Sequence, residues 1–325
     1  MTFLETKGID CIELGSGFPV GAVNTYLVYG EKLTLIDTGS NMAENMNLLI
    51  KGLEERQLTI YDIDQVLLTH HHLDHVGLLD QILEVHPIPV LGHPNCRPWL
   101  KQEPTLMNDY LAFSQRFLTE FGAPSDFVHK GEETVKNVRR LSCHANLDIE
   151  LNEGDIIPGL PGWKVIETKG HAQSHLSFFR EKDGVLLAGD HIIDRISSNA
   201  RIEPPLLPQL KREKSLIQYI ENLKKCAAMP VDIVLSGHGS AVKHLPQYVE
   251  NRLKDVEKRL SRMKEVIKKG YKSGFEIAME LFGSKITLEQ LNLVSSEIVG
   301  HLDILLELGE VNERKVNGVR FYRMS

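Results

Sequence analysis

Residues 69–75 read T-H-H-H-L-D-H, a density of imidazole and carboxylate groups that is typical of a metal site. His70 and His72 lie two positions apart, so an extended backbone points both side chains to the same side. Asp74 and His75 follow at a turn from which they can reach a second point nearby. The run 63–68 reads as a buried strand and the run 76–83 as a helix. A buried strand that ends in a ligand-rich loop therefore predicts a rigid platform for metal.

Four other apolar runs end in the same way, with a polar residue next to glycine. These runs are 33–36, 164–169, 184–188 and 231–236, and they lead into Asp37, His171, Asp190 and His238. Their content of β-formers predicts strands, and the adjacent glycines permit the tight turns that aim a side chain inward. We therefore expect five separate loops at strand ends to converge in space.

Over residues 10–245, the sequence resembles the metallo-β-lactamase-fold hydrolase superfamily, because it has all five motifs of that superfamily in the same order. The resemblance implies an α/β fold, an αββα four-layer sandwich whose metal site lies at one edge of two packed sheets. Antibiotic-degrading members often place Cys at a metal position or lack a bridging carboxylate, whereas this chain has Asp190. The chain therefore resembles the glyoxalase II, lactonase and ribonuclease branch of the superfamily.

The resemblance also implies two divalent metal ions and a ligand set for each. It assigns His70, His72 and His171 to the first metal, Asp74, His75 and His238 to the second, and Asp190 to both as a bridge. Imidazole and carboxylate ligands without thiolate favour Zn²⁺, with Mn²⁺ or Fe²⁺ as alternatives.

Three polar residues near these ligands are not expected to bind the metals. The resemblance gives Asp37 a role in orienting the ligand loop, and the alternative is a turn-forming Asp before Gly39. His175 is expected to be a supporting or structural residue, and His71 to be solvated or packed. Residues 168–175 read T-K-G-H-A-Q-S-H, which lacks the prolines and the second glycine of the common family motif, T-P-G-H-T-P-G-H. This altered loop could reshape the substrate entrance.

The segment between His75 and His171 predicts a helical insertion at about residues 97–135. Within it, apolar side chains recur at helical spacing at Leu106, Tyr110, Phe113, Phe117 and Phe121. We interpret the insertion as a cap in which Tyr110, Phe113 and Phe117 contact an apolar substrate; the alternative is that they only pack onto the sandwich. Further along the chain, Arg195 either binds an anionic substrate group or pairs with Asp194.

The sequence predicts a catalytic domain over residues 1–245 and a second part over residues 246–325. The second part starts with an amphipathic helix over 245–270. Helices starting at Thr287 and spanning 295–309, and a hairpin over 310–322 with an Asn-Gly turn, resemble a small winged-helix domain. Several hydrolases of the superfamily carry such a tail, including a group with ribonuclease activity. Because the second helix has little Lys or Arg, we favour packing or homodimer formation over groove binding.

The composition of the chain argues against nucleic acid and membrane as binding partners. Its 325 residues carry a net charge of −7, which argues against a surface for nucleic acid over the whole molecule. Residues 251–325 carry 14 basic and 11 acidic side chains, which is too weak a bias for a phosphate-binding footprint. No apolar run approaches the ~20 residues of a membrane helix, and the start lacks the pattern of a signal peptide. With four scattered cysteines, these features predict a cytoplasmic protein with reduced thiols.

The leading functional hypothesis is a dinuclear metal-dependent hydrolase that acts on a small ester, thioester or lactone. A metal-bound hydroxide would attack the carbonyl, and Asp74 and Asp190 are the expected catalytic carboxylates. The alternative is a metal-dependent ribonuclease or phosphodiesterase, favoured by the winged-helix-like tail but not by the acidic body. A third reading is a binding protein with a vestigial site, which the complete ligand set opposes.

Overall fold

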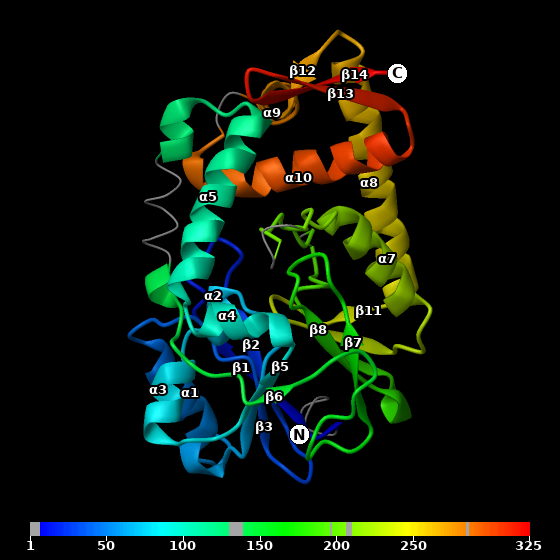
Figure 1. The fold of residues 1–325 in the computed structure, drawn as a ribbon. Coiled ribbons are helices and arrows are strands. Elements are labelled where there is room, and N and C mark those ends of the chain that lie inside the picture. The colour runs from blue at the N-terminus through cyan, green and yellow to red at the C-terminus, as the bar shows by residue number, and fades with distance from the viewer. Residues whose placement is uncertain (1–6, 130–138, 196, 206–209, 284–285) are drawn as a thin grey trace.

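The computed structural model describes residues 7–129, 139–195, 197–205, 210–283 and 286–325. Two β-sheets lie side by side in its lower half in Figure 1, and helices cover their outer faces. The C-terminal helices and a third, small sheet lie above the two larger sheets. Among the described residues, no helix is both long enough and apolar enough to cross a membrane.

The first sheet contains six strands in the order β1-β2-β3-β4-β5-β6. Their bounds are β1 Ile9–Leu14, β2 Val23–Val28, β3 Thr34–Ile36, β4 Gln65–Leu67, β5 Val90–Gly92 and β6 Ile149–Glu150. The first three strands pair antiparallel, and β3 to β6 pair parallel. The carboxyl ends of β3 and β4 therefore meet at one edge of the sheet, where the loops that follow them lie together.

The second sheet contains five strands in the order β11-β10-β9-β8-β7. Their bounds are β7 Trp163–Glu167, β8 Leu176–Arg180, β9 Val185–Gly189, β10 Ile233–Ser236 and β11 Val242–Lys243. Strands β9 and β10 are parallel neighbours, so the loops after Gly189 and Ser236 leave the sheet side by side.

Three hydrophobic cores separate the layers of the sandwich. Successive side chains of β9 belong to two of these cores, because side chains alternate between the two faces of a strand. Val185 and Leu187 lie in the core between the sheets, and Leu186 lies in the core on the opposite face. On that opposite face pack α7 (Ser215–Ala227) and the start of α8 (Leu245–Ile267).

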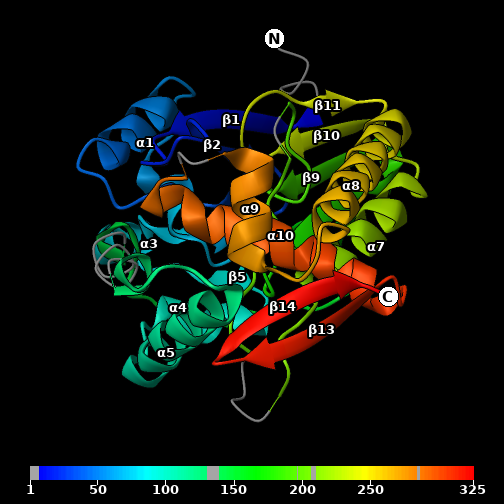
Figure 2. The same ribbon diagram turned by 90° about the horizontal axis from the view of Figure 1, so that it is seen from above.

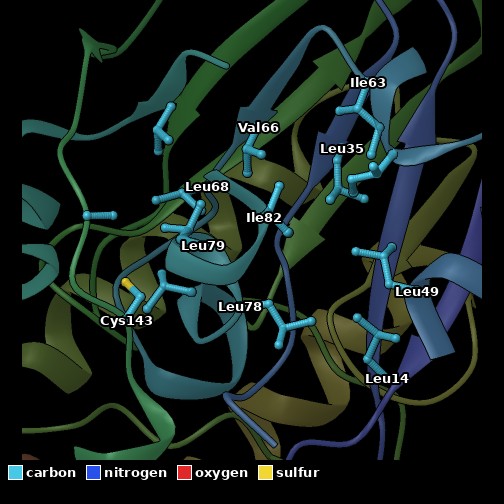
Figure 3. Close-up of a cluster of buried hydrophobic side chains, with 14 of the residues drawn as sticks. Leu14, Leu35, Leu49, Ile63, Val66, Leu68, Leu78, Leu79, Ile82 and Cys143 are labelled. Atoms are coloured by element: carbon cyan, nitrogen blue, oxygen red, sulfur yellow. The ribbon is translucent and has the colours of Figure 1, made fainter. Parts of the chain in front are cut away.

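The outer face of the first sheet carries α1 (Asn45–Glu54) and α3 (Leu79–Val85). Figure 3 shows this packing, with Leu49 and Ile82 facing Leu35 and Val66 of the sheet. The order helix, sheet, sheet, helix confirms the expected α/β sandwich.

The C-terminal elements form a fourth core with the predicted insertion. They are α9 (Gly274–Phe282), α10 (Leu288–Glu307) and the strands β12 (Lys272–Ser273), β13 (Val311–Val316) and β14 (Val319–Met324). Side chains of α10 and of the end of α8 pack there against Leu118 and Phe121 of α5 (Pro104–Phe121). Figure 1 shows α10 crossing between α5 and α8 above the two large sheets, and Figure 2 shows α9 and α10 from above.

Three sequence expectations differ in detail from the structure. The helix expected over 76–83 is two helices, α2 (Leu73–Val76) and α3, which break at Gly77. A Cβ atom on Gly77 would lie 2.2 Å from the backbone nitrogen of Asn41, so the chain passes here at a distance that only glycine permits. The two helices expected from Thr287 and over 295–309 are one continuous helix, α10. The helical insertion expected over about 97–135 begins with a short α4 (Arg97–Leu100) followed by α5, and residues 130–135 of that range lie outside the described residues.

The hairpin expected near the C-terminus lies where the sequence placed it. Strands β13 and β14 pair antiparallel, with Val316 opposite Val319. The two residues between them, Asn317 and Gly318, have φ of 48° and 85°. Positive φ at both central positions is the conformation that an Asn-Gly hairpin turn requires.

Candidate metal centre

The expected metal ligands come from the loops at the carboxyl ends of four strands. His70 and His72 follow β4, and Asp74 and His75 lie in α2 directly afterwards. His171, Asp190 and His238 follow β7, β9 and β10, in that order. All of these side chains are buried except that of His72, which is partly buried.

The first three histidines converge on one point. His72 Nδ1 lies 3.0 Å from His70 Nε2 and 2.9 Å from His171 Nε2. Three nitrogens bound to one tetrahedral zinc at 2.0–2.1 Å would lie about 3.3 Å apart. The spacing of these nitrogens is therefore close to that of a zinc coordination shell.

A second group lies beside the first, with Asp190 between them. His238 Nε2 lies 3.3 Å from an oxygen of Asp74 and 3.5 Å from Asp190 Oδ2. His75 Nε2 lies 3.4 Å from Asp190 Oδ1, and His171 Nε2 of the first group lies 3.5 Å from Asp190 Oδ2. The two oxygens of one carboxylate thus face ligand atoms of both groups, the position that a bridging ligand requires.

The outer nitrogen of each converging histidine has a partner of its own. The partners are Thr69 Oγ1 for His70 (3.0 Å), Glu203 for His72 (3.5 Å), the Asn199 carbonyl for His171 (3.0 Å), Asp37 Oδ2 for His75 (2.8 Å) and the Ala22 carbonyl for His238 (2.7 Å). Carbonyl and carboxylate oxygens only accept, and the Thr69 hydroxyl already donates to Asp37. The outer nitrogens of His70, His75, His171 and His238 therefore carry the proton, and in a neutral ring the inner nitrogen presents a lone pair. The outer nitrogen of His72 faces the carboxylate of Glu203, whose Oε1 makes no hydrogen bond within the described residues.

The inner atoms of the site fit a divalent metal pair. Lone pairs of three neutral imidazoles that face one another at about 3 Å repel unless a cation lies between them. Within the described residues, His75 Nε2, His238 Nε2 and Asp190 Oδ1 are buried and find no hydrogen-bond partner. Unpaired buried polar atoms are costly, and here they point to the same small volume. Nitrogen and carboxylate oxygen are also the ligands that zinc prefers.

The electrostatics differ between the two groups. Burial lowers the pKa of His72 to about 3 and that of His171 to about 4, and it holds the pKa of His70 well below its usual range. Burial also disfavours the charged form of His238, but Asp190 and Asp74 outweigh it and raise the pKa of His238 to about 10. The three histidines of the first group are therefore neutral at pH 7. In the second group, His238 is protonated and carries a positive charge.

His75 behaves in the same way as His238. Burial opposes its charge, and the carboxylates of Asp190, Asp37 and Asp74 overcome burial and raise its pKa well above the usual range. Burial by itself would raise the pKa of Asp190, but the charges on His75 and His238 keep that carboxyl ionised, with a pKa well below the usual range.

Asp37 and His175 both form hydrogen bonds to the expected ligands or to their neighbours. Asp37 accepts from the Thr69 backbone nitrogen at 2.8 Å as well as from His75, so one carboxylate fixes both ends of the ligand stretch. His175 Nε2 accepts from the Asp190 backbone nitrogen at 3.1 Å, while its Nδ1 bonds to Thr168 Oγ1 at 2.8 Å.

Glu203 is a buried member of the site that sequence reasoning missed. Its Oε1 lies 3.5 Å from His72 Nε2 and 3.3 Å from His71 Nε2. His71, expected to be solvated or packed, is buried, and its ring stacks on Trp99 at 4.4 Å. No motif marks Glu203 in the sequence, because it lies in an irregular segment between Arg201 and two prolines. The carboxylate supports His72 from the side opposite the metal position.

The residues expected to contact substrate lie in two different places. Tyr110, Phe113 and Phe117 of α5 line a small hollow together with Arg201 and residues of α10. Tyr110 also meets Trp99 edge to face at 5.6 Å, which links α5 to the stacked His71 ring. By contrast, the side chain of Arg195 is 88% exposed and lies 3.4 Å from Asp194. Of the two roles expected for Arg195, the structure shows the ion pair with Asp194.

A paired cluster of buried histidines and carboxylates at the edge of an αββα sandwich is typical of metal-dependent hydrolases. The chain belongs to the metallo-beta-lactamase superfamily, whose sequence model matches residues 18–238, and it is a metal-dependent hydrolase of that superfamily. The probable metallo-hydrolase YqjP of Bacillus subtilis is 35% identical over 302 residues, which cover 93% of each chain.

Two further relatives extend this comparison. The crystal structure of the metallo-beta-lactamase family protein TTHA1429 from Thermus thermophilus has a TM-score of 0.80 at 25% identity, covering 98% of this chain and 99% of that one. The likeness therefore includes the C-terminal elements. An atrochrysone carboxyl ACP thioesterase of Aspergillus fumigatus is 24% identical over 255 residues, which cover 78% of this chain and 46% of that protein.

Proposed function

We propose that this chain is a dinuclear metal hydrolase that acts on a small ester, thioester or lactone. The observation that carries the proposal is the meeting of three imidazole nitrogens at 2.9–3.0 Å, where hydrogen bonds on the opposite ring nitrogens of His70 and His171 turn their lone pairs inward. Beside them, three further buried ligand atoms have no partner within the described part of the chain. Such an arrangement is unfavourable without cations and favourable with two.

In this proposal His70, His72 and His171 hold one metal, Asp74, His75 and His238 hold the other, and Asp190 contacts both. A bound pair of divalent metals lowers the pKa of water and polarises a substrate carbonyl. Zinc suits the nitrogen and oxygen donors, while manganese and iron remain alternatives.

The protein residues orient and move protons around this pair. Burial alone would raise the pKa of Asp74, but His75 and His238 outweigh it and keep the carboxyl ionised. Asp74 can therefore accept a proton from the attacking water and pass it to the leaving group. Asp190 holds its two oxygens 3.4–3.5 Å from expected ligand nitrogens of both groups, so this carboxylate would serve both metals.

A small acyl compound is proposed as the substrate class from the comparison with relatives and not from a pocket. The aromatic side chains of α5 line a hollow of only about 20 Å³, which holds little more than one water molecule and does not enclose an acyl group. One relative carries the name of a thioesterase, which supports a thioester among the three carbonyl classes.

A ribonuclease or phosphodiesterase is the second candidate function. It would be favoured if the C-terminal elements had a free surface for nucleic acid. We propose that residues 246–325 form a separate winged-helix-like part whose role is packing. Buried Leu291, Ile298, Leu302 and Leu305 bind α10 into the C-terminal core. Asp303 of the same helix is paired with Arg212 at 2.7 Å. A helix held on these sides has little free surface for a nucleic-acid groove.

Metal analysis and a substrate panel test the proposal. The purified chain should bind two zinc ions, and the zinc-loaded chain should hydrolyse an acyl thioester, an aryl ester or a lactone but not a short RNA. His72→Ala and Asp190→Ala should each lose metal and activity while their circular dichroism stays that of the wild type. Cleavage of RNA without ester hydrolysis would reverse the order of the candidates. Unchanged metal content in both variants would refute the ligand assignment.

A further inference from the structure

Arg201 lies in the chain between two residues that contact histidines of the first ligand group. Asn199 places its carbonyl oxygen 3.0 Å from His171 Nδ1, and Glu203 places its Oε1 3.5 Å from His72 Nε2. Arg201 is two residues away from each of these contacts, so the length of the chain alone keeps its backbone within about 7 Å of the backbone of both. Arg201 is therefore a neighbour of the first ligand group without belonging to it.

A second set of contacts places the surroundings of Arg201 beside the same ligands. Arg201 lines the small hollow between α5 and α10 together with Tyr110. The Tyr110 ring meets Trp99 edge to face at 5.6 Å, and Trp99 stacks on His71 at 4.4 Å. His71 directly precedes His72 in the ligand stretch. The hollow is thus two ring contacts away from the ligand stretch, and Figure 1 shows α5 and α10 above the two large sheets.

The guanidinium of Arg201 lacks the partner that comparable arginines have. Arg201 is partly buried, yet it forms no hydrogen bond or ion pair with any residue that the structure describes. Glu203, the nearest acidic residue in the sequence, accepts instead from the Gln173 backbone nitrogen at 3.0 Å. A guanidinium removed from part of its water is costly unless an acceptor replaces that water. Six other buried or partly buried arginines lie 2.7–3.4 Å from a carboxylate, namely Arg56, Arg97, Arg180, Arg212, Arg259 and Arg320. Arg201 is therefore available for an anion that is not part of the chain.

The hollow beside Arg201 suits one small acidic group. Ser114 of α5 and Asn292 of α10 also line it and offer a hydroxyl and an amide as further hydrogen-bond donors. Its volume of about 20 Å³ receives a group of about the size of a water molecule, which favours one end of a carboxylate over a larger phosphate. The planar guanidinium binds a carboxylate through two parallel hydrogen bonds. The rest of such a molecule lies outside the hollow.

We propose that Arg201 is a specificity-determining residue that binds a free carboxylate at the far end of the acyl part of the substrate. The inference rests on the proposed function, because it concerns the substrate of the same metal centre. A carboxylate at Arg201 replaces the water that the guanidinium has lost, and it holds the acyl chain by one end beside the first ligand group. The preferred substrates are then esters or thioesters of dicarboxylic acids, which are recognised at one carboxyl and hydrolysed at the other.

Matched pairs of thioesters test the inference. Glutaric, adipic and pimelic acid, each joined through one carboxyl to the same neutral thiol, keep the far carboxylate. The corresponding monoamides replace that carboxylate by an uncharged group of the same size. With the zinc-loaded chain, kcat/KM for at least one acid should exceed that for its amide by about tenfold or more, the usual contribution of a hydrogen bond to a charged group. Equal kcat/KM values within all three pairs would overturn the inference and leave the proposed function intact.

Variants assign the preference to Arg201. Arg201→Gln removes the charge and should bring the acid-to-amide ratio of kcat/KM to about one, and Arg201→Lys, which keeps the charge but not the planar fork, should leave an intermediate ratio. General damage to the fold or to the metal centre lowers both rates together and does not move this ratio. Arg195→Gln is the matched control and should keep the wild-type ratio, because Arg195 is 88% exposed and lies 3.4 Å from Asp194. A wild-type ratio in Arg201→Gln would overturn the assignment.

Binding without turnover separates this inference from the proposed function. If none of the thioesters is hydrolysed, the proposed function fails, and calorimetry on the metal-free chain then compares adipic acid monoamide with adipamide, which lacks the carboxylate. The wild type should bind the monoamide more tightly by about tenfold or more, and Arg201→Gln should bind both compounds equally. Circular dichroism verifies the fold of each variant. Equal affinity of the wild type and of Arg201→Gln for the monoamide would overturn the inference without reference to hydrolysis.

Discussion

The carboxylate of Asp37 holds the ring of His75 from behind, with Oδ2 2.8 Å from Nδ1. Asp37 itself has a φ of 59°, in the left-handed region that few residues other than Gly, Asn and Asp adopt readily. The same carboxylate accepts from the backbone and the hydroxyl of Thr69 at 2.8 and 2.7 Å. One residue at the end of β3 thus orients a proposed ligand directly and the start of the ligand stretch through Thr69.

Replacing Asp37 by Asn should weaken metal binding without unfolding the chain. Asn has nearly the same shape and tolerates the left-handed backbone, but its amide lacks the charge that fixes the His75 tautomer. Loss of such a supporting partner costs 10–100-fold in metal affinity, which competition with a chromophoric zinc chelator measures. Asp64→Asn is the control, since Asp64 accepts from the Leu33 backbone at 2.7 Å on the same sheet. Equal zinc affinity in both variants would show that Asp37 only shapes a turn.

Glu203→Gln should also lower zinc affinity, by about tenfold. Burial disfavours the ionised form of this carboxyl, but His71 and His72 outweigh it and hold the pKa of Glu203 well below its usual range. The variant keeps the shape of the side chain, whose Oε1 lies 3.5 Å from His72 Nε2, but removes the negative charge that makes His72 a stronger ligand. Glu150→Gln, which breaks an exposed pair with Arg97 at 2.7 Å, should bind zinc like the wild type. If Glu203 were only a packing residue, the two variants would not differ.

The motifs predicted which side chains meet at the edge of the sandwich, because most of the expected ligands follow the end of a strand. His70, His171, Asp190 and His238 need only a strand end and a glycine-containing turn to reach the edge of the sandwich. Glu203 could not be predicted in this way, because its position depends on how an irregular segment folds back onto His72. The break between α2 and α3 also depends on residues far away in the sequence, because the backbone at Gly77 lies in close contact with the backbone of Asn41 and Leu141. Aromatic periodicity predicted α5, but nothing in the sequence indicated that α10 would face it.

Metal binding should release protons from the second ligand group and not from the first. In metal-free chain at pH 7, His238, with its pKa raised to about 10, holds a proton, as does His75, whose pKa is raised well above its usual range. A metal at Nε2 must displace both protons, so affinity for the second ion should rise with pH between pH 6 and 8 by up to about 100-fold per unit. Affinity for the first ion should be almost constant, because burial keeps the pKa of His72 and of His171 at about 3 and 4.

Calorimetry in buffers of different ionisation enthalpy counts these protons. Saturation with zinc should release about two protons per chain at pH 7, and His238→Ala should reduce the number to about one. Absence of proton release from the wild type would mean that the second group is neutral before metal arrives. The raised pKa values of His75 and His238 would then be wrong.

The last prediction concerns the attachment of the inserted helix to the C-terminal part. Glu120 of α5 lies 2.7 Å from Lys315 Nζ and 2.8 Å from Arg320 Nε, so one carboxylate ties α5 to the β13–β14 hairpin. Burial alone would raise the pKa of Glu120, but the hydrogen bonds from Lys315 and Arg320 outweigh it and lower the pKa. A carboxyl whose pKa is lowered by folding stabilises the fold fully above its unfolded pKa, and this contribution disappears as pH falls through the lowered folded value.

Glu120→Gln should therefore destabilise metal-free chain at pH 7, by about 0.5–1 kcal/mol because water screens a partly exposed pair. The difference from wild type should shrink steadily as pH falls below the usual glutamate pKa, because the wild-type carboxyl then begins to take up its proton. Urea titrations at pH 7, 5 and 3, followed by circular dichroism, measure this trend. Glu55→Gln provides the control, because Glu55 and Lys51 form a longer, 4.0 Å pair with 61% and 72% exposed side chains and should contribute much less. A Glu120→Gln effect that stayed constant from pH 7 to pH 3 would mean that shape, and not charge, holds α5 against the hairpin.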